Sequence, residues 1–211
     1  MTEVDVSLTD YILCLEATWF AVAIHASGNK SDLATYLKIT FAGFAAASFL
    51  GGTTHGFFNT PDSALHAPLW WSTLIFIGIT ATGFALSGLA LLGTRTLHYG
   101  RIVAIAALAV YLITTIFYQE FLLAIVFYTP ATIVCMAGFF VANRRWAGRG
   151  ISFGTAGILI SLIAPVIQQM QISFHPVYFT YNAVYHVVLM PALFLIFKGS
   201  VAALNTTGSI E

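Results

Sequence analysis

Seven long apolar runs take up most of this chain and constrain its fold more than any other feature. Each run is close to the length of about 20 residues that an α-helix needs to cross a membrane. Short segments rich in turn-forming and helix-breaking residues separate them. The runs cover roughly residues 8–27, 33–58, 67–92, 101–118, 121–142, 151–172 and 177–199. The sequence therefore predicts an all-α integral membrane protein, a seven-transmembrane-helix bundle that forms one domain over residues 1–211.

The composition favours the same class of protein. Of the 211 residues, 59% are hydrophobic and 8% are charged, whereas soluble domains usually carry about 25% charged residues. The net charge is zero, so no basic surface indicates nucleic acid as a partner. Cys14 and Cys135 lie inside apolar runs, which is typical of packed thiols. The acidic start MTEVDVSLTD lacks the basic segment of a signal peptide, so we expect the first helix to remain in the mature protein.

The charged residues predict how the bundle is inserted. With seven helices, all eight basic residues fall on the same side of the membrane. Basic residues concentrate in cytoplasmic loops, so we expect the N-terminus outside and the C-terminus in the cytoplasm. The basic residues are Lys30, Lys38, Arg95, Arg101, Arg144, Arg145, Arg149 and Lys198, and the opposite side carries Glu3, Asp5, Asp10, Asp62 and Glu120.

Polar side chains within the apolar runs gather in the predicted outer half of the bundle. His55 lies near the outer end of the second run, Gln168 near that of the sixth, and Glu16 about two turns into the first. Asn182 and His186 are four residues apart near the start of the last run, so they share one helical face. An acidic side chain at the centre of a membrane helix costs about 2.5–3.5 kcal/mol. We therefore expect Glu16 to face the interior of the bundle.

His55, Asn182 and His186 admit three interpretations. They could form hydrogen bonds between helices, which contribute about 0.6 kcal/mol each in membranes. They could bind zinc, because two imidazoles with an amide or a carboxylate leave a position open for water. They could also line a pocket without metal, for a lipid headgroup or a quinone.

Two segments carry a resemblance to known proteins. FLGGTTHGF in the second run and YNAVYHVVLMPALFLIFKG in the seventh resemble a bacterial family of small, uncharacterised seven-helix proteins. That family is similar to a distant branch of the CREST superfamily, which includes alkaline ceramidases and the adiponectin and progestin receptors. The resemblance implies a zinc site in which His55 and His186 match two of three histidine ligands and Asn182 stands at the third. It also implies a serine one turn before His55, where this chain has Gly51, and an aspartate in the third run, which has none.

The resemblance leads us to expect a zinc-dependent membrane hydrolase that acts on lipid amides or esters. Zinc would lower the pKa of its bound water to about 7, and Glu16 would take the proton as catalytic base. The residues expected to support the metal ligands or line the pocket are Thr54, Ser48, Tyr185 and Gln168.

The alternative is a non-catalytic seven-helix protein that binds membrane lipid or serves as an accessory subunit of a larger membrane complex. The missing aspartate and Asn182 favour this alternative, whereas Glu16, His55 and His186 favour the hydrolase. The resemblance to bacterial proteins places either one in the bacterial cytoplasmic (inner) membrane. The oligomeric state stays open.

Overall fold

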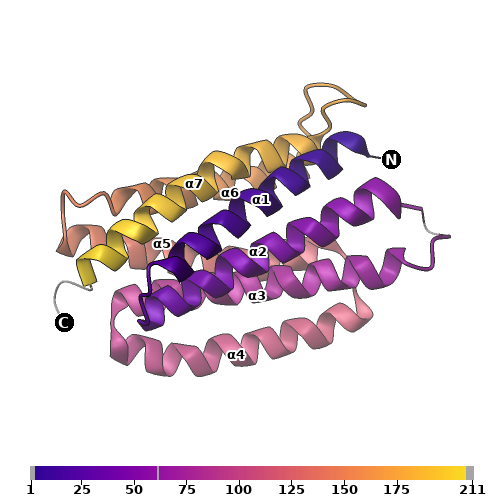
Figure 1. Cartoon of the computed structure of the whole chain (residues 1–211). Helices are drawn as coiled ribbons and strands as arrows, with labels where there is room; N and C mark the ends of the chain where they lie inside the picture. The colour runs from indigo at the N-terminus through magenta and orange to yellow at the C-terminus, as the bar shows by residue number, and fades with distance from the viewer. Residues whose placement is uncertain (1–2, 61, 208–211) are drawn as a thin grey trace.

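The helices of the computed structural model follow the apolar runs in number and order (Figure 1). The structure describes residues 3–60 and 62–207, and these residues form seven α-helices. Each helix is long and apolar enough to cross a membrane. An all-α protein with seven membrane-spanning candidates is thereby confirmed, and its direction of insertion stays a prediction. The helices are α1 (Val4–Ala26), α2 (Asp32–Phe57), α3 (His66–Leu92), α4 (Thr94–Phe117), α5 (Phe121–Arg145), α6 (Ser152–Gln169) and α7 (Tyr181–Thr207).

The largest differences in boundaries concern α4 and α7. We expected residues 93–100 to form a loop, but α4 begins at Thr94, directly after Gly93. Gly93 has a φ of 130°, a conformation that glycine adopts easily, so this one residue makes the turn. We expected the last helix over residues 177–199, but α7 starts at Tyr181 and continues to Thr207.

Six helices form a closed ring, and α4 lies outside it. Around the ring, α1 packs on α2, α2 on α3, α3 on α5, α5 on α6, α6 on α7, and α7 on α1. Figure 1 shows α1 and α7 side by side and α4 at the edge of the bundle, against α3. Among the described residues of α4, the buried ones are Leu97, Tyr111 and Thr115. The candidate site lies within the ring.

Two tryptophans of α3 attach the end of α4. The indole N–H of Trp70 donates to the carbonyl oxygen of Gln119 at 2.7 Å, just beyond the end of α4. The indole N–H of Trp71 donates to the hydroxyl of Thr115 at 3.2 Å. Both bonds lie at the end of α3 that is near the N-terminus of the chain (Figure 1).

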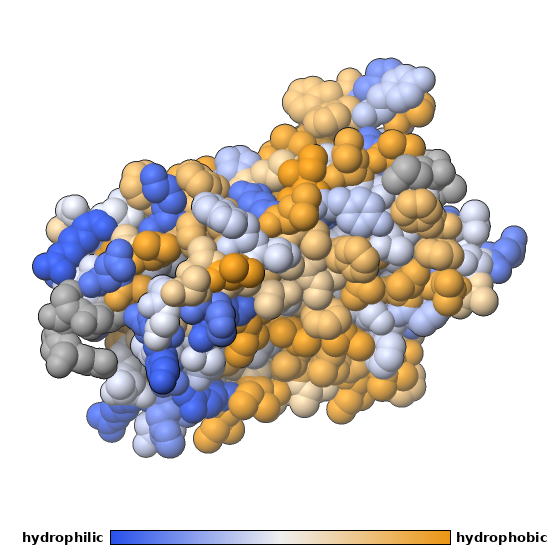
Figure 2. Space-filling model, in the orientation of Figure 1, coloured by the Kyte–Doolittle hydropathy of each residue, from blue (hydrophilic) through white to orange (hydrophobic). Residues whose placement is uncertain are grey.

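The hydrophobic core fills the half of the ring that is farther from the N-terminus. The largest fully buried side chains there are Phe20, Phe41, Phe84 and Phe139, and Phe20 stacks on Phe197 with 4.4 Å between ring centroids. Figure 2 shows hydrophobic residues over the middle of the molecule and hydrophilic residues gathered at the end that carries the C-terminus. Tightly packed aromatic side chains thus fill this half of the ring.

We expect Gly88→Leu to destabilise the bundle. A Cβ at Gly88 of α3 would lie 2.5 Å from the Cα of Cys135 in α5, so the larger side chain would push these helices apart. Overpacking of this kind costs about 1–3 kcal/mol, measurable as a lower unfolding temperature in detergent. Ala106→Leu, on the exposed face of α4, is the control. Equal stability of the two variants would contradict the close packing of α3 on α5.

Candidate functional site

A cavity of about 280 Å³ lies within the ring, in the half that carries the N-terminus. All six ring helices contribute to its lining, and the described residues of α4 do not. Most of the lining is aromatic or aliphatic, and the remainder comprises an acid, two imidazoles, amides and hydroxyls. The volume is near the lower limit of the roughly 300–1,000 Å³ typical of small-molecule pockets.

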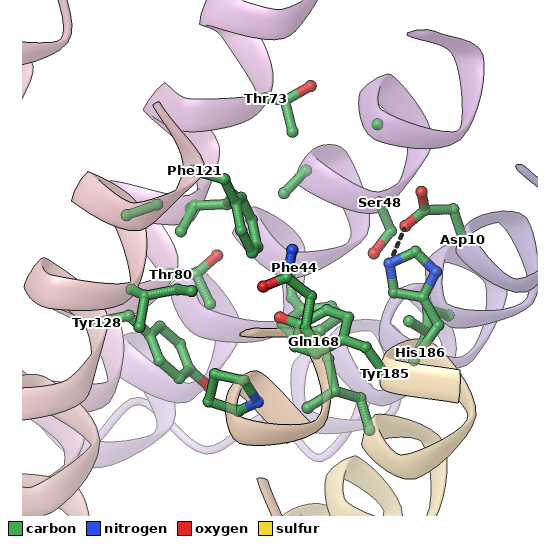
Figure 3. Close-up of a pocket in the computed structure, with 18 of the residues that line it drawn as sticks. Asp10, Phe44, Ser48, Thr73, Thr80, Phe121, Tyr128, Gln168, Tyr185 and His186 are labelled. Carbon is green, nitrogen blue, oxygen red and sulfur yellow. Dashed lines mark ion pairs between the residues drawn. The ribbon is translucent and has the colours of Figure 1, made fainter. Parts of the chain in front are cut away.

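Asp10 and His186 meet at the wall of this cavity. Asp10 comes from α1 and His186 from α7, with 3.4 Å between Oδ1 and Nε2. Their residues are 5% and 9% exposed, respectively. Figure 3 shows the two side chains together with Ser48 of α2. An ionisable pair is costly inside a membrane bundle and usually marks a functional position, so this pair is the centre of the candidate site.

Thr9 fixes the orientation of the His186 ring. The Thr9 hydroxyl oxygen lies 3.0 Å from His186 Nδ1 and 2.9 Å from the carbonyl oxygens of Asp5 and Val6. The contact with Thr9 holds Nδ1 on one side of the ring and leaves Nε2 facing Asp10 at the wall of the cavity. This orientation holds for either tautomer of the imidazole.

Two glycines of α2 make room for Asp10. A Cβ at Gly52 would lie 2.9 Å from the Cβ of Asp10, and a Cβ at Gly51 would lie 3.3 Å from Asp10 Oδ2. The Ser7 hydroxyl donates to the carbonyl oxygen of Gly52 at 2.8 Å and holds the same crossing together. Gly51 stands where the resemblance implies a serine, and in this chain the position lets α1 bring its carboxylate against α2.

His55, Asn182 and His186 all line the cavity, but they have different partners. His55 Nδ1 lies 2.5 Å from a carboxylate oxygen of Glu3. The Asn182 side-chain oxygen accepts from the amide of Gln168 at 3.5 Å. The structure therefore gathers the predicted residues around one space without joining them in one group.

The other predicted residues divide in the same way. Ser48, Tyr185 and Gln168 line the cavity. Thr54 is buried, is not among the residues that line the cavity, and donates its hydroxyl to the carbonyl oxygen of Leu50 at 2.8 Å. Glu16 is also not among the lining residues, and its buried Oε2 has no hydrogen-bond partner among the described residues. The proposed base is thus placed apart from the polar pair.

The residues of the site do not fit the zinc centre that the resemblance implies. A catalytic zinc site usually has three protein ligands and one water. Within residues 3–60 and 62–207, no three His, Cys, Asp or Glu side chains lie close enough to share a metal ion. Asp10 and His186 offer two ligands, while His55 is turned to Glu3. These residues therefore give no mechanism that depends on a metal, and the zinc binding that the resemblance implies has to be tested by metal analysis.

Sequence reasoning missed Asp10 because it started the first helix too late. With a start at residue 8, Asp10 counts as an acid at the membrane interface, but α1 begins at Val4 and carries Asp10 almost two turns inward. The buried residues Leu13 and Ala17 follow three and seven positions later, the spacing of one helical face. This pattern could have shown that Asp10 faces the interior. Glu16, six residues after Asp10, lies on a different face.

Comparison with known protein families places the chain but does not assign an activity. The family described as "Family of unknown function (DUF6962)" matches residues 6–205. The chain belongs to this family. The match to DUF6962 reaches into all seven helices and includes both Asp10 and His186. No curated protein and no solved structure matches the chain.

We expect Asp10 and His186 to be energetically coupled. Asp10→Leu and His186→Leu each leave a buried polar group without this partner, at a cost of about 1–3 kcal/mol, while the double variant removes both groups. A double-mutant cycle on unfolding free energy in detergent should give a coupling of about 0.5–3 kcal/mol. The same cycle with Asp10→Leu and Thr115→Val, at the α3–α4 contact outside the ring, should give none. Zero coupling in the first cycle would show that the pair does not interact.

Proposed function

We propose that this protein binds a small amphiphilic molecule in the cavity. The polar group of the ligand lies at Asp10 and His186, and its apolar part lies against the aromatic wall. The main support for this proposal is that a buried acid–imidazole pair lies in the wall of a mostly apolar cavity inside the bundle. Mostly apolar pockets with a few convergent polar groups are typical of small-molecule sites.

Further hydrogen-bonding groups line the cavity away from this pair. In the view of Figure 3, Thr80 of α3 and Tyr128 of α5 lie on the side opposite Asp10 and His186, with Phe44 between them. A ligand that reaches across the cavity meets polar groups at both ends and an aromatic surface along its length. This arrangement supports binding of a molecule with a defined orientation, because each end requires different chemistry.

The direction of insertion is part of the same proposal. The loops and helix ends with most of the basic residues lie at the end of the bundle that carries the C-terminus, and Figure 2 shows hydrophilic residues gathered there. Basic residues favour the cytoplasmic side, which supports an N-terminus outside and a cavity in the outer half of the membrane. The resemblance to bacterial proteins supports the cytoplasmic membrane as the location.

We expect Ala47→Leu to expel the bound molecule. Ala47 lines the cavity, and the larger side chain would fill space that the ligand needs. Mass spectrometry of molecules extracted from the purified protein should show at least about a fivefold loss, because overpacking a filled site costs about 1 kcal/mol or more. Ala42→Leu, on the exposed face of α2, should retain the wild-type amount. Equal retention in both variants would contradict the cavity as the binding site.

Hydrolysis of lipid amides or esters is the second candidate. The observation that favours it is the contact of Asp10 with His186 beside the cavity, since a carboxylate and an imidazole are the usual groups of acid–base catalysis. The Asp10 carboxylate would take a proton from water as the water oxygen attacks the carbonyl carbon of a bound amide or ester. The leaving amine or alcohol would then receive that proton.

Metal analysis separates the metal-dependent form of this reaction from the proposed binding function. We expect no stoichiometric zinc in protein purified without chelators, because the described side chains do not form a three-ligand group. About one zinc per chain, lost in His55→Ala and in His186→Ala, would contradict this expectation. Cleavage of a lipid-amide panel by wild type but not by His186→Ala would then establish the hydrolase.

A further inference from the structure

An acid and an imidazole lie side by side at the wall of the cavity. Nδ1 of His186 is held 3.0 Å from the Thr9 hydroxyl, and Nε2 lies 3.4 Å from the nearest carboxylate oxygen of Asp10. A direct charge-assisted hydrogen bond is typically about 2.7–2.9 Å long. The contact between Asp10 and His186 is longer than that, so the carboxylate keeps the capacity to accept a hydrogen bond from a ligand in the cavity.

Aromatic rings continue from this pair around the cavity. The ring of Tyr185 lies 5.2 Å from that of His186, Phe121 lies 6.2 Å from Tyr185, and Trp70 lies 6.2 Å from Phe121, measured between ring centroids. His55 follows at 5.9 Å from Trp70. All five residues line the cavity. Because the face of an aromatic ring carries negative electrostatic potential, such a wall attracts positively charged groups.

The cavity offers no fixed positive charge to an anionic ligand. Of the described residues that line it, none is lysine or arginine. A phosphate or carboxylate placed in the cavity would lose its hydration and would stand near the carboxylate of Asp10. A cation in the same place would gain both the carboxylate and the ring faces. The charged groups of the lining therefore favour a positively charged ligand over a negatively charged one.

We infer that the ligand carries an organic ammonium group. This group lies against the Asp10 carboxylate on its cavity side, beside His186, with the rings of Tyr185 and Phe121 against its substituents. The inference rests on the proposed function and names the chemical class of the molecule that fills the cavity. The ammonium group of a membrane lipid and a free alkylammonium ion share this chemistry, and they are distinguished by experiment.

The test compares choline with 3,3-dimethylbutan-1-ol, in which an uncharged carbon replaces the ammonium nitrogen. The full-length protein in phosphatidylglycerol nanodiscs, which contain no ammonium lipid, is titrated with each probe by calorimetry. Choline should bind at least about tenfold more tightly than its uncharged counterpart. A short-chain phosphatidylcholine forms the third arm. Tighter binding of this lipid than of choline identifies a lipid headgroup as the ligand, and the reverse order identifies a free ion.

Variants of Asp10 and Phe121 test whether these side chains cause the preference for choline over its uncharged counterpart. Asp10→Asn removes the charge and keeps the shape, and Phe121→Leu removes the ring face and keeps an apolar side chain. Each should weaken choline binding by about tenfold, while Phe121→Tyr should retain it. Phe117→Leu, on α4 and 73% exposed, is the matched control for a lost ring. If Asp10→Asn does not fold, the pair Phe121→Leu and Phe121→Tyr decides.

The failures of the two proposals look different. Equal binding of choline and its uncharged counterpart, unchanged by Phe121→Leu, would overturn the ammonium class and leave the cavity as an amphiphile site. Binding of neither probe, together with no molecule extracted from the wild-type protein, would overturn both. Tight choline binding that survives Phe121→Leu and Asp10→Asn would place the ammonium site elsewhere and overturn the inference alone.

Discussion

The contact between Asp10 and His186 links the first helix of the chain to the last, and the nearby structure is arranged around it. Two ionisable groups that leave water lose hydration, and their attraction offsets the loss only when the geometry is right. Thr9 sets the direction of the imidazole, and the glycine pair Gly51–Gly52 lets α1 approach α2 closely enough to bring the carboxylate inside. Small or polar residues at three positions, Thr9, Gly51 and Gly52, are thus explained by one polar contact.

The same residue type has opposite consequences in the two halves of the ring. Toward the C-terminal end, Phe20 and Phe197 stack and fill the interior. Near the N-terminal end, Phe121 and Tyr185 meet edge to face and border a cavity. An apolar side chain packed tightly against a buried carboxylate or imidazole would block its hydrogen-bonding atoms and could not bond to them itself, which is costly. Tight aromatic packing therefore ends where the polar pair begins.

The sequence was sufficient for the helices because the thickness of a bilayer dictates the length of an apolar run. It also brought Asn182 and His186 to one polar space, since a spacing of four fixes a shared helical face. The spacing of Leu13 and Ala17 pointed Asp10 to the interior, but its depth depends on where α1 begins, and the first polar residues of a membrane helix leave that start undefined. Glu16 lies deeper in the apolar run, so it was the predicted catalytic base. Which side of α1 faces the cavity depends on how this helix packs against α2 and α7, and the sequence does not show that packing. Gly93 alone separates α3 from α4. The polar residues that follow it resemble a loop in the sequence, although they belong to the first turns of α4.

One hydrogen bond connects α4, the helix outside the ring, to the wall of the cavity. The indole of Trp70 lines the cavity, and its N–H is bonded to the backbone just beyond α4. α4 is the helix with the most surface available to lipid, because it stands outside the ring. Helices adapt to changes in bilayer thickness by tilting, at a modest cost in free energy. Tilting of α4 would move the carbonyl group that holds the Trp70 indole, and a change in bilayer thickness would then reach one wall of the cavity through this bond.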